Sequence, residues 1–177
     1  LDPALAEGLD DSKKLSARRR NDLFEILSDP ACACARVAVG EASVEEIDRL
    51  NILQASLLAM QRAAEALSAA LGAALESAPR AALVDGNKLP QLACAARAVV
   101  KGDSRSLSIA AASVVAKVTR DRAMAALARD YPGYGWERNQ GYGTAEHRAG
   151  IARLGVTPLH RRSFRPIRDA LQSKSLT

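Results

Sequence analysis

Apolar residues recur at helical spacing along several stretches of this chain, and each stretch is bordered by residues that start or stop helices. Ser16 is a predicted N-cap, Ser43-Val44-Glu45-Glu46 is a capping-box pattern, and Thr144 caps a helix that ends at Gly155. The predicted helices follow Ser16 and Ser43, span Asn51 to Glu76 and Ser106 or Ser108 to about Asp130, and begin again at Thr144 and Pro166.

Three shorter runs have the composition of strands: Cys32 to Val39, Ala81 to Val84 and Ala96 to Val100. Short strands that alternate with long helices predict an α/β domain. We expect the run Ala81 to Val84 to be a buried strand. The helix Asn51 to Glu76 is apolar nearly all round, so we expect it to be substantially buried as well.

The composition is that of a single globular domain over residues 1–177, with 48% hydrophobic and 25% charged residues but only 3% aromatic residues. No stretch is long and apolar enough to predict a membrane span. The formal charge of +5 favours a polyanionic partner, and basic side chains gather near both ends, where residues 161–177 form a basic tail with a helix. The odd number of cysteines (Cys32, Cys34 and Cys94) completes no metal site and predicts free thiols in a reducing cytoplasm.

Asp85 follows the strand Ala81 to Val84, at the edge where α/β sheets place ligands, and Gly86 would let another group approach the backbone. Asp121 shares a helix face with Lys117. If the small residues of Ala110 to Ala112 hold that helix close to the sheet, two carboxylates meet and suit Mg²⁺ or Mn²⁺. A simple Asp-Gly turn and a solvated Lys117–Asp121 pair are the alternative interpretations.

The loop from Gly133 to Thr144 holds half of the six aromatic residues: Tyr134, Trp136 and Tyr142. Aromatic rings beside arginines suit stacking on a sugar or base, and a packed loop is the alternative. The sequence contains no phosphate-binding P-loop, no dinucleotide fingerprint and no serine-nucleophile signature, which disfavours nucleotide hydrolysis, dinucleotide chemistry and acyl transfer.

Seven motifs in this order resemble the ribonuclease HII family over nearly the whole chain. They are Asp10 to Ser16, Glu46 to Asp48 with Leu50 to Leu53, Val84 to Asn87, Val100 to Arg122, Tyr131 to Gly135, Gly141 to Thr144 with His147, and Pro158 to Phe164. The resemblance implies a ribonuclease H-like fold, with a mixed sheet flanked by helices. It also implies an endonuclease that hydrolyses the RNA strand of RNA–DNA hybrids and nicks duplex DNA 5′ of embedded ribonucleotides.

The resemblance further implies a two-metal mechanism with Mn²⁺ or Mg²⁺ that leaves 5′-phosphate and 3′-hydroxyl ends. Asp85 and Asp121 match two of the four metal-binding acids, which makes them the expected catalytic residues. The residues expected to contact the substrate are Tyr142, which would stack on the sugar at the RNA–DNA junction, Lys13, Lys14, Asn87, Lys117 and Arg161. We expect a cytoplasmic monomer that needs no membrane, and a sliding clamp is left open as a partner.

Some features depart from the family pattern. Asn139 and Gln140 stand where a His-Lys pair is expected, and Trp136 stands in place of a phenylalanine. The first two strands of the family, with the Asp-Glu-Ala-Gly-Arg-Gly motif and the other two acids, do not precede Asp10. We therefore expect these 177 residues by themselves to fold poorly and to be nearly inactive. A catalytically inactive nucleic-acid-binding module and a junction resolvase of the same fold are the alternative functions.

Overall fold

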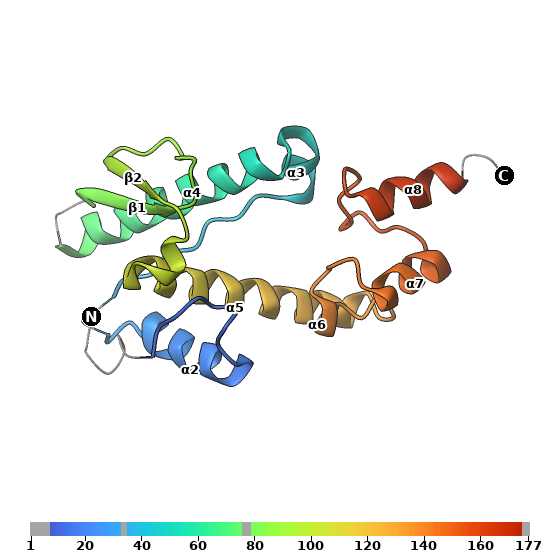
Figure 1. The fold of residues 1–177 in the computed structure, drawn as a ribbon, viewed down its shortest axis with the longest axis horizontal. Helices are drawn as coiled ribbons and strands as arrows, with labels where there is room; N and C mark the ends of the chain where they lie inside the picture. Colours follow the sequence, from blue (N-terminus) through green and yellow to red (C-terminus); the bar gives the residue numbers. More distant parts are fainter. Residues whose placement is uncertain (1–7, 33–34, 76–78, 175–177) are drawn as a thin grey trace. The chain divides into compact units, whose positions relative to one another are not determined.

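The computed structural model describes residues 8–32, 35–75 and 79–174, which divide into two compact units. The first unit comprises Leu1–Glu41 and Ser56–Val118, and the second comprises Ala42–Ala55 and Thr119–Thr177. Two long helices, α4 (Ile52–Leu75) and α5 (Leu107–Asp130), contribute residues to both units (Figure 1).

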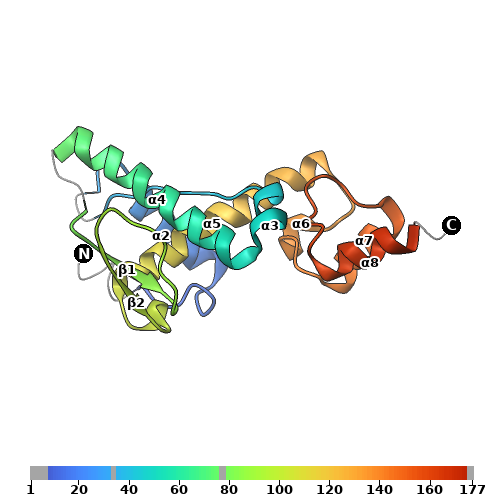
Figure 2. The ribbon, with the colours of Figure 1, turned by 90° about the horizontal axis from the view of Figure 1, so that it is seen from above.

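The first unit contains a sheet of two parallel strands, β1 (Ala81–Asp85) and β2 (Ala95–Val99), which lie side by side in Figures 1 and 2. Their register pairs Ala81 with Ala95 and Asp85 with Val99. A 3₁₀ turn, η1 (Gly102–Ser104), follows β2 and leads into α5. Both strands occur within one residue of the predicted positions, so the predicted α/β class is confirmed.

The core of the first unit lies between α2 (Ala17–Ser28) and the first half of α5. Ser16 caps α2 as predicted, because its hydroxyl accepts a hydrogen bond from the backbone N–H of Arg19. The buried side chains of this core are Leu9, Leu23, Leu27, Ala110, Val114, Val115 and Val118. Ala110 lies in this core while Ala112 is exposed, so the three alanines do not form one buried patch.

The predicted strand over Cys32 to Val39 is wrong for the residues that the structure describes. Residues 35–39 form neither strand nor helix. A strand exists only where its backbone pairs with a neighbour. In the described part of the chain the sheet consists of β1 and β2, which pair with each other.

The predicted burial of two elements is also wrong. In β1 only Val84 is buried, and Leu83 is half exposed. Along α4, Ile52 and Leu53 are exposed although the helix is rich in apolar residues. An apolar composition stabilises a buried position only where another element covers it, and the two-stranded sheet of the described residues leaves much apolar surface uncovered.

The second unit consists mainly of helices: α3 (Val44–Leu50), α6 (Trp136–Asn139), α7 (Ala145–Leu154) and α8 (Arg165–Lys174), with the ends of α4 and α5. Ser43 and Glu46 form the predicted capping box, and Thr144 caps α7. The buried side chains of its core are Met124, Tyr134, Trp136, Ile151 and Ile167. For Tyr134 and Trp136 the structure therefore favours the alternative interpretation, in which the rings pack inside the protein and do not stack on a sugar or base.

Two further expectations concern single features. Among the described residues, no helix has the length and apolarity needed to cross a membrane. Among the described residues, Cys32 and Cys94 are half-buried and form no disulfide, and Cys34 lies outside the described residues.

Candidate nucleic-acid and metal site

Asp85 stands at the carboxyl end of β1, where its exposed side chain is held by the chain that follows β2. Its Oδ1 accepts a hydrogen bond from the backbone N–H of Gly102 at 2.7 Å. The next residue, Gly86, has a φ of +99°, and apart from its chain neighbours no atom of the described residues lies within 4 Å of the position that a Cβ would take. Asp85 therefore stands at the strand end that the sequence predicts, and the hydrogen bond from Gly102 orients its carboxylate.

The donor chemistry of Asp85 fits a hard divalent cation, since carboxylate oxygens are the ligands that Mg²⁺ and Mn²⁺ prefer. Among the residues that the structure describes, no cluster of three or more histidine, cysteine, aspartate or glutamate side chains could hold a metal ion. Asp121 lies half-buried on α5 in the second unit, and Lys117 lies on the same helix in the first unit. The meeting of Asp85 with Asp121 stays a prediction.

Lys13 and Lys14 project from a turn that precedes α2, and both side chains are exposed. Within this turn Ser12 is buried. The guanidinium of Arg20 donates hydrogen bonds to the carbonyl oxygen of Ser12 at 2.9 Å and to that of Leu15. Arg20 therefore fixes the backbone that carries the two lysines. Arg20 is one of the basic side chains near the start of the chain, and no local pattern in the sequence indicates that it folds back on the turn.

Two aspartates complete the same turn. The backbone N–H of Lys13 donates to Oδ1 of Asp11 at 2.9 Å, and the ammonium of Lys14 lies 3.1 Å from Oδ1 of Asp10. The backbone N–H of Asp11 and the ammonium of Lys14 lower the pKa of Asp10. Asn87, another polar residue expected near the substrate, is exposed in the loop after β1.

Tyr142 is the most exposed large side chain of the aromatic loop, with 68% of its surface accessible. Its backbone is nevertheless fixed on both sides. The N–H of Tyr142 donates to the carbonyl of Asn139 at 2.8 Å, and its carbonyl accepts from the N–H of Thr144 at 2.8 Å and contacts Nδ1 of His147 at 3.0 Å. The loop therefore presents an accessible ring on a backbone that is already ordered.

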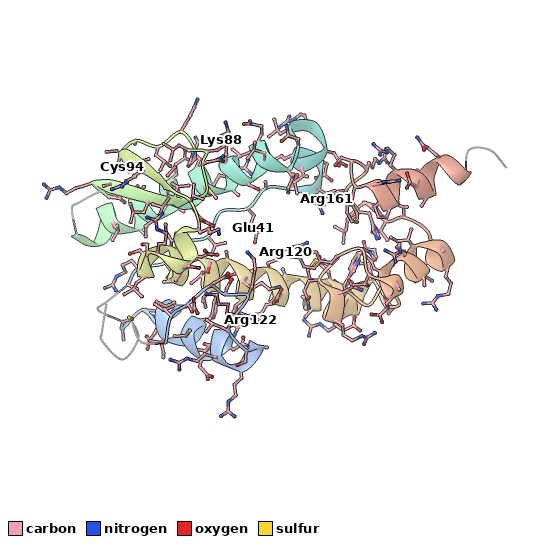
Figure 3. The ribbon with its side chains drawn as sticks, in the orientation of Figure 1. Glu41, Lys88, Cys94, Arg120, Arg122 and Arg161 are labelled. Atoms are coloured by element: carbon pink, nitrogen blue, oxygen red, sulfur yellow. The ribbon has the colours of Figure 1, made fainter. Side chains whose placement is uncertain are left out.

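Arg161, labelled in Figure 3, lies over the ring of Phe164. Its guanidinium carbon lies 5.3 Å from the centre of the Phe164 ring. A Cβ added at Gly143 would lie 3.3 Å from the tip of the same ring, so Phe164 packs directly against the residue after Tyr142. Phe164 therefore lies beside Arg161 and beside Gly143, the residue that follows Tyr142 in the chain.

The turn that carries Arg161 is tied to α3 by Asp48. The carboxylate of Asp48 accepts hydrogen bonds from the backbone N–H of Arg162 at 2.8 Å, from that of Ser163 at 2.9 Å and from the Ser163 hydroxyl at 2.6 Å. Burial acts to raise the pKa of Asp48, but these hydrogen bonds and the charge of Arg161 outweigh it and lower the pKa. Asp48 therefore acts as an ionised anchor for the basic turn.

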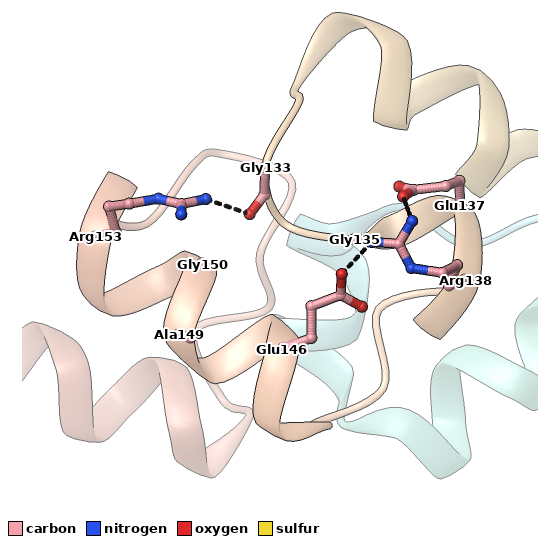
Figure 4. A pocket seen from close by; sticks show the side chains of 8 residues that line it. All are labelled: Gly133, Gly135, Glu137, Arg138, Glu146, Ala149, Gly150 and Arg153. Atoms are coloured by element: carbon pink, nitrogen blue, oxygen red, sulfur yellow. Dashed lines mark hydrogen bonds and ion pairs between the residues drawn. The ribbon is translucent and has the colours of Figure 1, made fainter.

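A hollow of about 310 Å³ lies beside α6 and α7 in the second unit, and Figure 4 shows its lining. Arg138 pairs there with Glu137 and Glu146, and the guanidinium of Arg153 donates to the carbonyl of Gly133 at 3.1 Å. The hydrogen bond from Arg138 lowers the pKa of Glu146. Because both arginines already have protein partners, this hollow is a poor site for phosphate.

Comparison with known proteins agrees with the resemblance in the sequence. The family model described as "Ribonuclease HII" matches residues 4–167. Ribonuclease HII of Rhodospirillum rubrum is 58% identical over 176 residues, which cover 99% of this chain and 76% of the relative. Ribonuclease HII of Ruegeria pomeroyi is 58% identical over 173 residues (97% and 69%), and that of Paramagnetospirillum magneticum is 58% identical over 172 residues (94% and 80%). The chain therefore belongs to the ribonuclease HII family of enzymes.

Proposed function

We propose that this enzyme hydrolyses the RNA strand of RNA–DNA hybrids and nicks duplex DNA 5′ of embedded ribonucleotides, leaving 5′-phosphate and 3′-hydroxyl ends. The observation that carries the proposal is the Tyr142 loop, in which an exposed ring stands on a backbone fixed by hydrogen bonds. A ring that is ordered before the substrate arrives stacks on a sugar or base with a smaller loss of conformational entropy. The 2′-hydroxyl at such a junction is what distinguishes RNA from DNA.

The proposed catalytic residues are Asp85 and Asp121, which would hold Mn²⁺ or Mg²⁺. Two such cations, when bound, would supply a nucleophilic water and would stabilise the charge that develops on the leaving 3′-oxygen. The hydrogen bond from Gly102 to Asp85 supports this role, because it orients the carboxylate without neutralising it. The proposed substrate-contacting side chains are polar or aromatic and comprise Lys13, Lys14, Asn87, Lys117, Tyr142 and Arg161.

The proposal also covers the oligomeric state, the cellular location and the binding partners of the enzyme. We propose a single domain that acts as a cytoplasmic monomer on RNA–DNA hybrids and on ribonucleotide-containing duplexes. Lys13 and Lys14 would contact phosphates, so binding should weaken as the salt concentration rises. Co-purification with a sliding clamp is the observation that would add that partner.

The test uses the full-length enzyme and the substitution Asp85→Asn. The amide oxygen of asparagine still accepts the hydrogen bond from Gly102, whereas the negative charge is lost. Asp22→Asn is the matched control, because Asp22 is an exposed aspartate on α2. The assay measures cleavage and binding of a duplex that carries one ribonucleotide, with Mn²⁺ or Mg²⁺ present.

We expect Asp85→Asn to abolish the nick and to leave binding intact, while the Asp22→Asn enzyme cleaves like the wild type. Undiminished cleavage by Asp85→Asn would overturn the metal assignment. A preference of the wild type for four-way junctions over the ribonucleotide-containing duplex would favour a junction resolvase. Tight binding of the duplex by the wild type without any cleavage would favour an inactive binding module.

A further inference from the structure

The second unit buries two histidines against each other, although no catalytic role has been given to either. His147 and His160 are 3% and 5% exposed, and their Nε2 atoms lie 3.2 Å apart. The two rings stack with their centres 5.3 Å apart and their planes 25° apart. Buried polar atoms in proteins are almost always hydrogen-bonded, so the position of each proton can be deduced from the partners.

The partners of His147 determine which of its nitrogens carries hydrogen. The indole Nε1–H of Trp136 lies 3.1 Å from Nε2 of His147, and an indole N–H can only donate. Nε2 of His147 must therefore offer a lone pair, and the proton of the neutral ring lies on Nδ1. That Nδ1–H donates to the carbonyl of Tyr142 at 3.0 Å, and a carbonyl can only accept.

The partners of His160 determine the opposite tautomer. Nδ1 of His160 accepts a hydrogen bond from the backbone N–H of Thr157 at 3.1 Å and contacts the Thr157 hydroxyl at 2.8 Å. Because a backbone N–H can only donate, Nδ1 offers a lone pair and the proton of this ring lies on Nε2. That Nε2–H points to Nε2 of His147, whose one lone pair it shares with the indole N–H of Trp136. Burial, followed by the neighbouring His147, lowers the pKa of His160 to about 4, which agrees with a neutral ring at physiological pH.

The two rings thus form one directed line of hydrogen bonds, from the N–H of Thr157 through His160 and His147 to the carbonyl of Tyr142. The start of α7 fixes the position of His147 in this line of hydrogen bonds. His147 is the third residue of α7, and its own N–H donates to the hydroxyl of the cap residue Thr144. The His147 ring is therefore placed by the helix and oriented by its partners before it reaches the loop.

We propose that His147, with its tautomer fixed by Trp136 and His160, is a positioning residue that holds the Tyr142 loop in the conformation that presents the ring to the sugar at the RNA–DNA junction. Tyr142 is flanked by Gly141 and Gly143, which by themselves restrict the loop little. The hydrogen bond from Nδ1 of His147 to the Tyr142 carbonyl restricts the backbone conformation that the two glycines leave free. The inference rests on the proposed function, because it assumes that the Tyr142 ring contacts the substrate.

Two amide substitutions at position 147 separate positioning from simple filling of the core. In His147→Asn the amide nitrogen can occupy the place of Nδ1 and donate to the Tyr142 carbonyl. In His147→Gln the amide lies near the place of Nε2, so the bond to Tyr142 is lost while a polar partner remains for Trp136 and His160. Both variants are made in the full-length enzyme, alone and together with Tyr142→Ala.

The activity assay measures kcat/KM for nicking a duplex with one ribonucleotide. We expect His147→Gln to lower kcat/KM about fivefold, as the loss of one hydrogen bond implies, and His147→Asn to restore most of it. In the Tyr142→Ala enzyme, His147→Gln should cause no further loss, since His147 acts through Tyr142. Additive losses, or an Asn variant as weak as the Gln variant, would overturn the inference.

A spectroscopic measurement decides the inference independently of activity. Long-range ¹⁵N–¹H correlation spectra of the wild type should show the proton of His147 on Nδ1 and that of His160 on Nε2, with the signals assigned by comparison with His160→Gln. Finding His147 protonated on Nε2 would overturn the inference. If Tyr142→Ala instead cleaves like the wild type, the sugar-stacking role in the proposed function fails, and the positioning role built on it fails as well, even where the tautomers are as deduced.

Discussion

We expect acid to destabilise this protein through His160, and the size of the effect follows from its surroundings. Burial and the neighbouring His147 lower the pKa of His160 from its ordinary value of 6.5 to about 4. Between these two pH values the unfolded chain binds a proton that the folded chain does not bind. The stability that His160 contributes is therefore present above pH 6.5 and is lost as the pH falls toward 4.

The loss between pH 7 and pH 5 can be worked out from the two pKa values. At pH 5 the unfolded histidine is almost fully protonated, whereas only about a tenth of the folded molecules carry a proton on His160. Integrating the difference in bound protons over this interval gives a decrease of about 2 kcal/mol in the free energy of unfolding. That decrease is a large part of the stability of an ordinary domain, which is about 5–15 kcal/mol.

The assay compares urea unfolding of the wild type and His160→Gln at pH 7 and at pH 5. Glutamine keeps a donor that can reach His147 but does not titrate. Trp136 is the single tryptophan of this sequence and lies in the same core, so its fluorescence reports the relevant transition. We expect the wild type to lose about 2 kcal/mol more than His160→Gln on acidification, since all other titrating groups are common to both proteins. Equal losses in the two proteins would refute the reasoning.

Two other predictions concern stability away from the histidines. Asp48→Asn should lower the free energy of unfolding by about 1–2 kcal/mol, because the anchor of the turn at Ser163 loses its charge; an unchanged urea midpoint would contradict this. Gly40→Ala and Gly72→Ala should shift the urea midpoint in opposite directions. A Cβ at Gly40 would lie 2.2 Å from the carbonyl oxygen of Ala59, which costs about 1–3 kcal/mol. A Cβ at Gly72 meets no atom of a neighbouring element within 4 Å among the described residues, and it stabilises the helix by about 1 kcal/mol. Midpoints that move in the same direction would contradict this reading of the two glycines.

The helix boundaries could be predicted from the sequence because they depend on neighbouring residues. Ser16 and Thr144 cap helices through hydrogen bonds that span three residues, and Ser43 with Glu46 forms a capping box over the same distance. Gly155 ends α7 with a backbone N–H bonded four residues back. Such signals are complete within a few positions of the chain, so no knowledge of the fold is needed to interpret them.

The burial of elements could not be predicted in this way, because it depends on residues that are distant in the sequence. The run Cys32 to Val39 has the composition of a strand, but residues 35–39 pair with no strand among the described residues. The apolar face of α4 was expected to be covered, and Ile52 and Leu53 are exposed. Composition predicts what a segment could bury, whereas only the arrangement of the chain decides what covers it.

In the candidate site, too, features that depend on neighbouring residues could be predicted, whereas features that depend on distant residues could not. Asp85 and Tyr142 could be predicted, because a carboxylate at a strand end and an aromatic ring between two glycines are local features. The anchor of Asp48 on Ser163 could not, because 115 positions separate the two residues. His147 was noted in the sequence only as part of a motif, since its meeting with His160 depends on the packing of α7 against the loop that follows it.

The two ends of the histidine line explain why it can hold one loop conformation. The N–H of Thr157 can only donate and the carbonyl of Tyr142 can only accept, so the protons between them have a single arrangement. Two neutral imidazoles suit this task because each ring has one donor and one acceptor on opposite sides. A change at His160 that keeps a donor toward His147 leaves the last bond to Tyr142 in place. His160→Gln should therefore alter the acid stability and spare the discrimination for ribonucleotides, whereas His147→Gln should impair that discrimination at every pH at which the enzyme is folded.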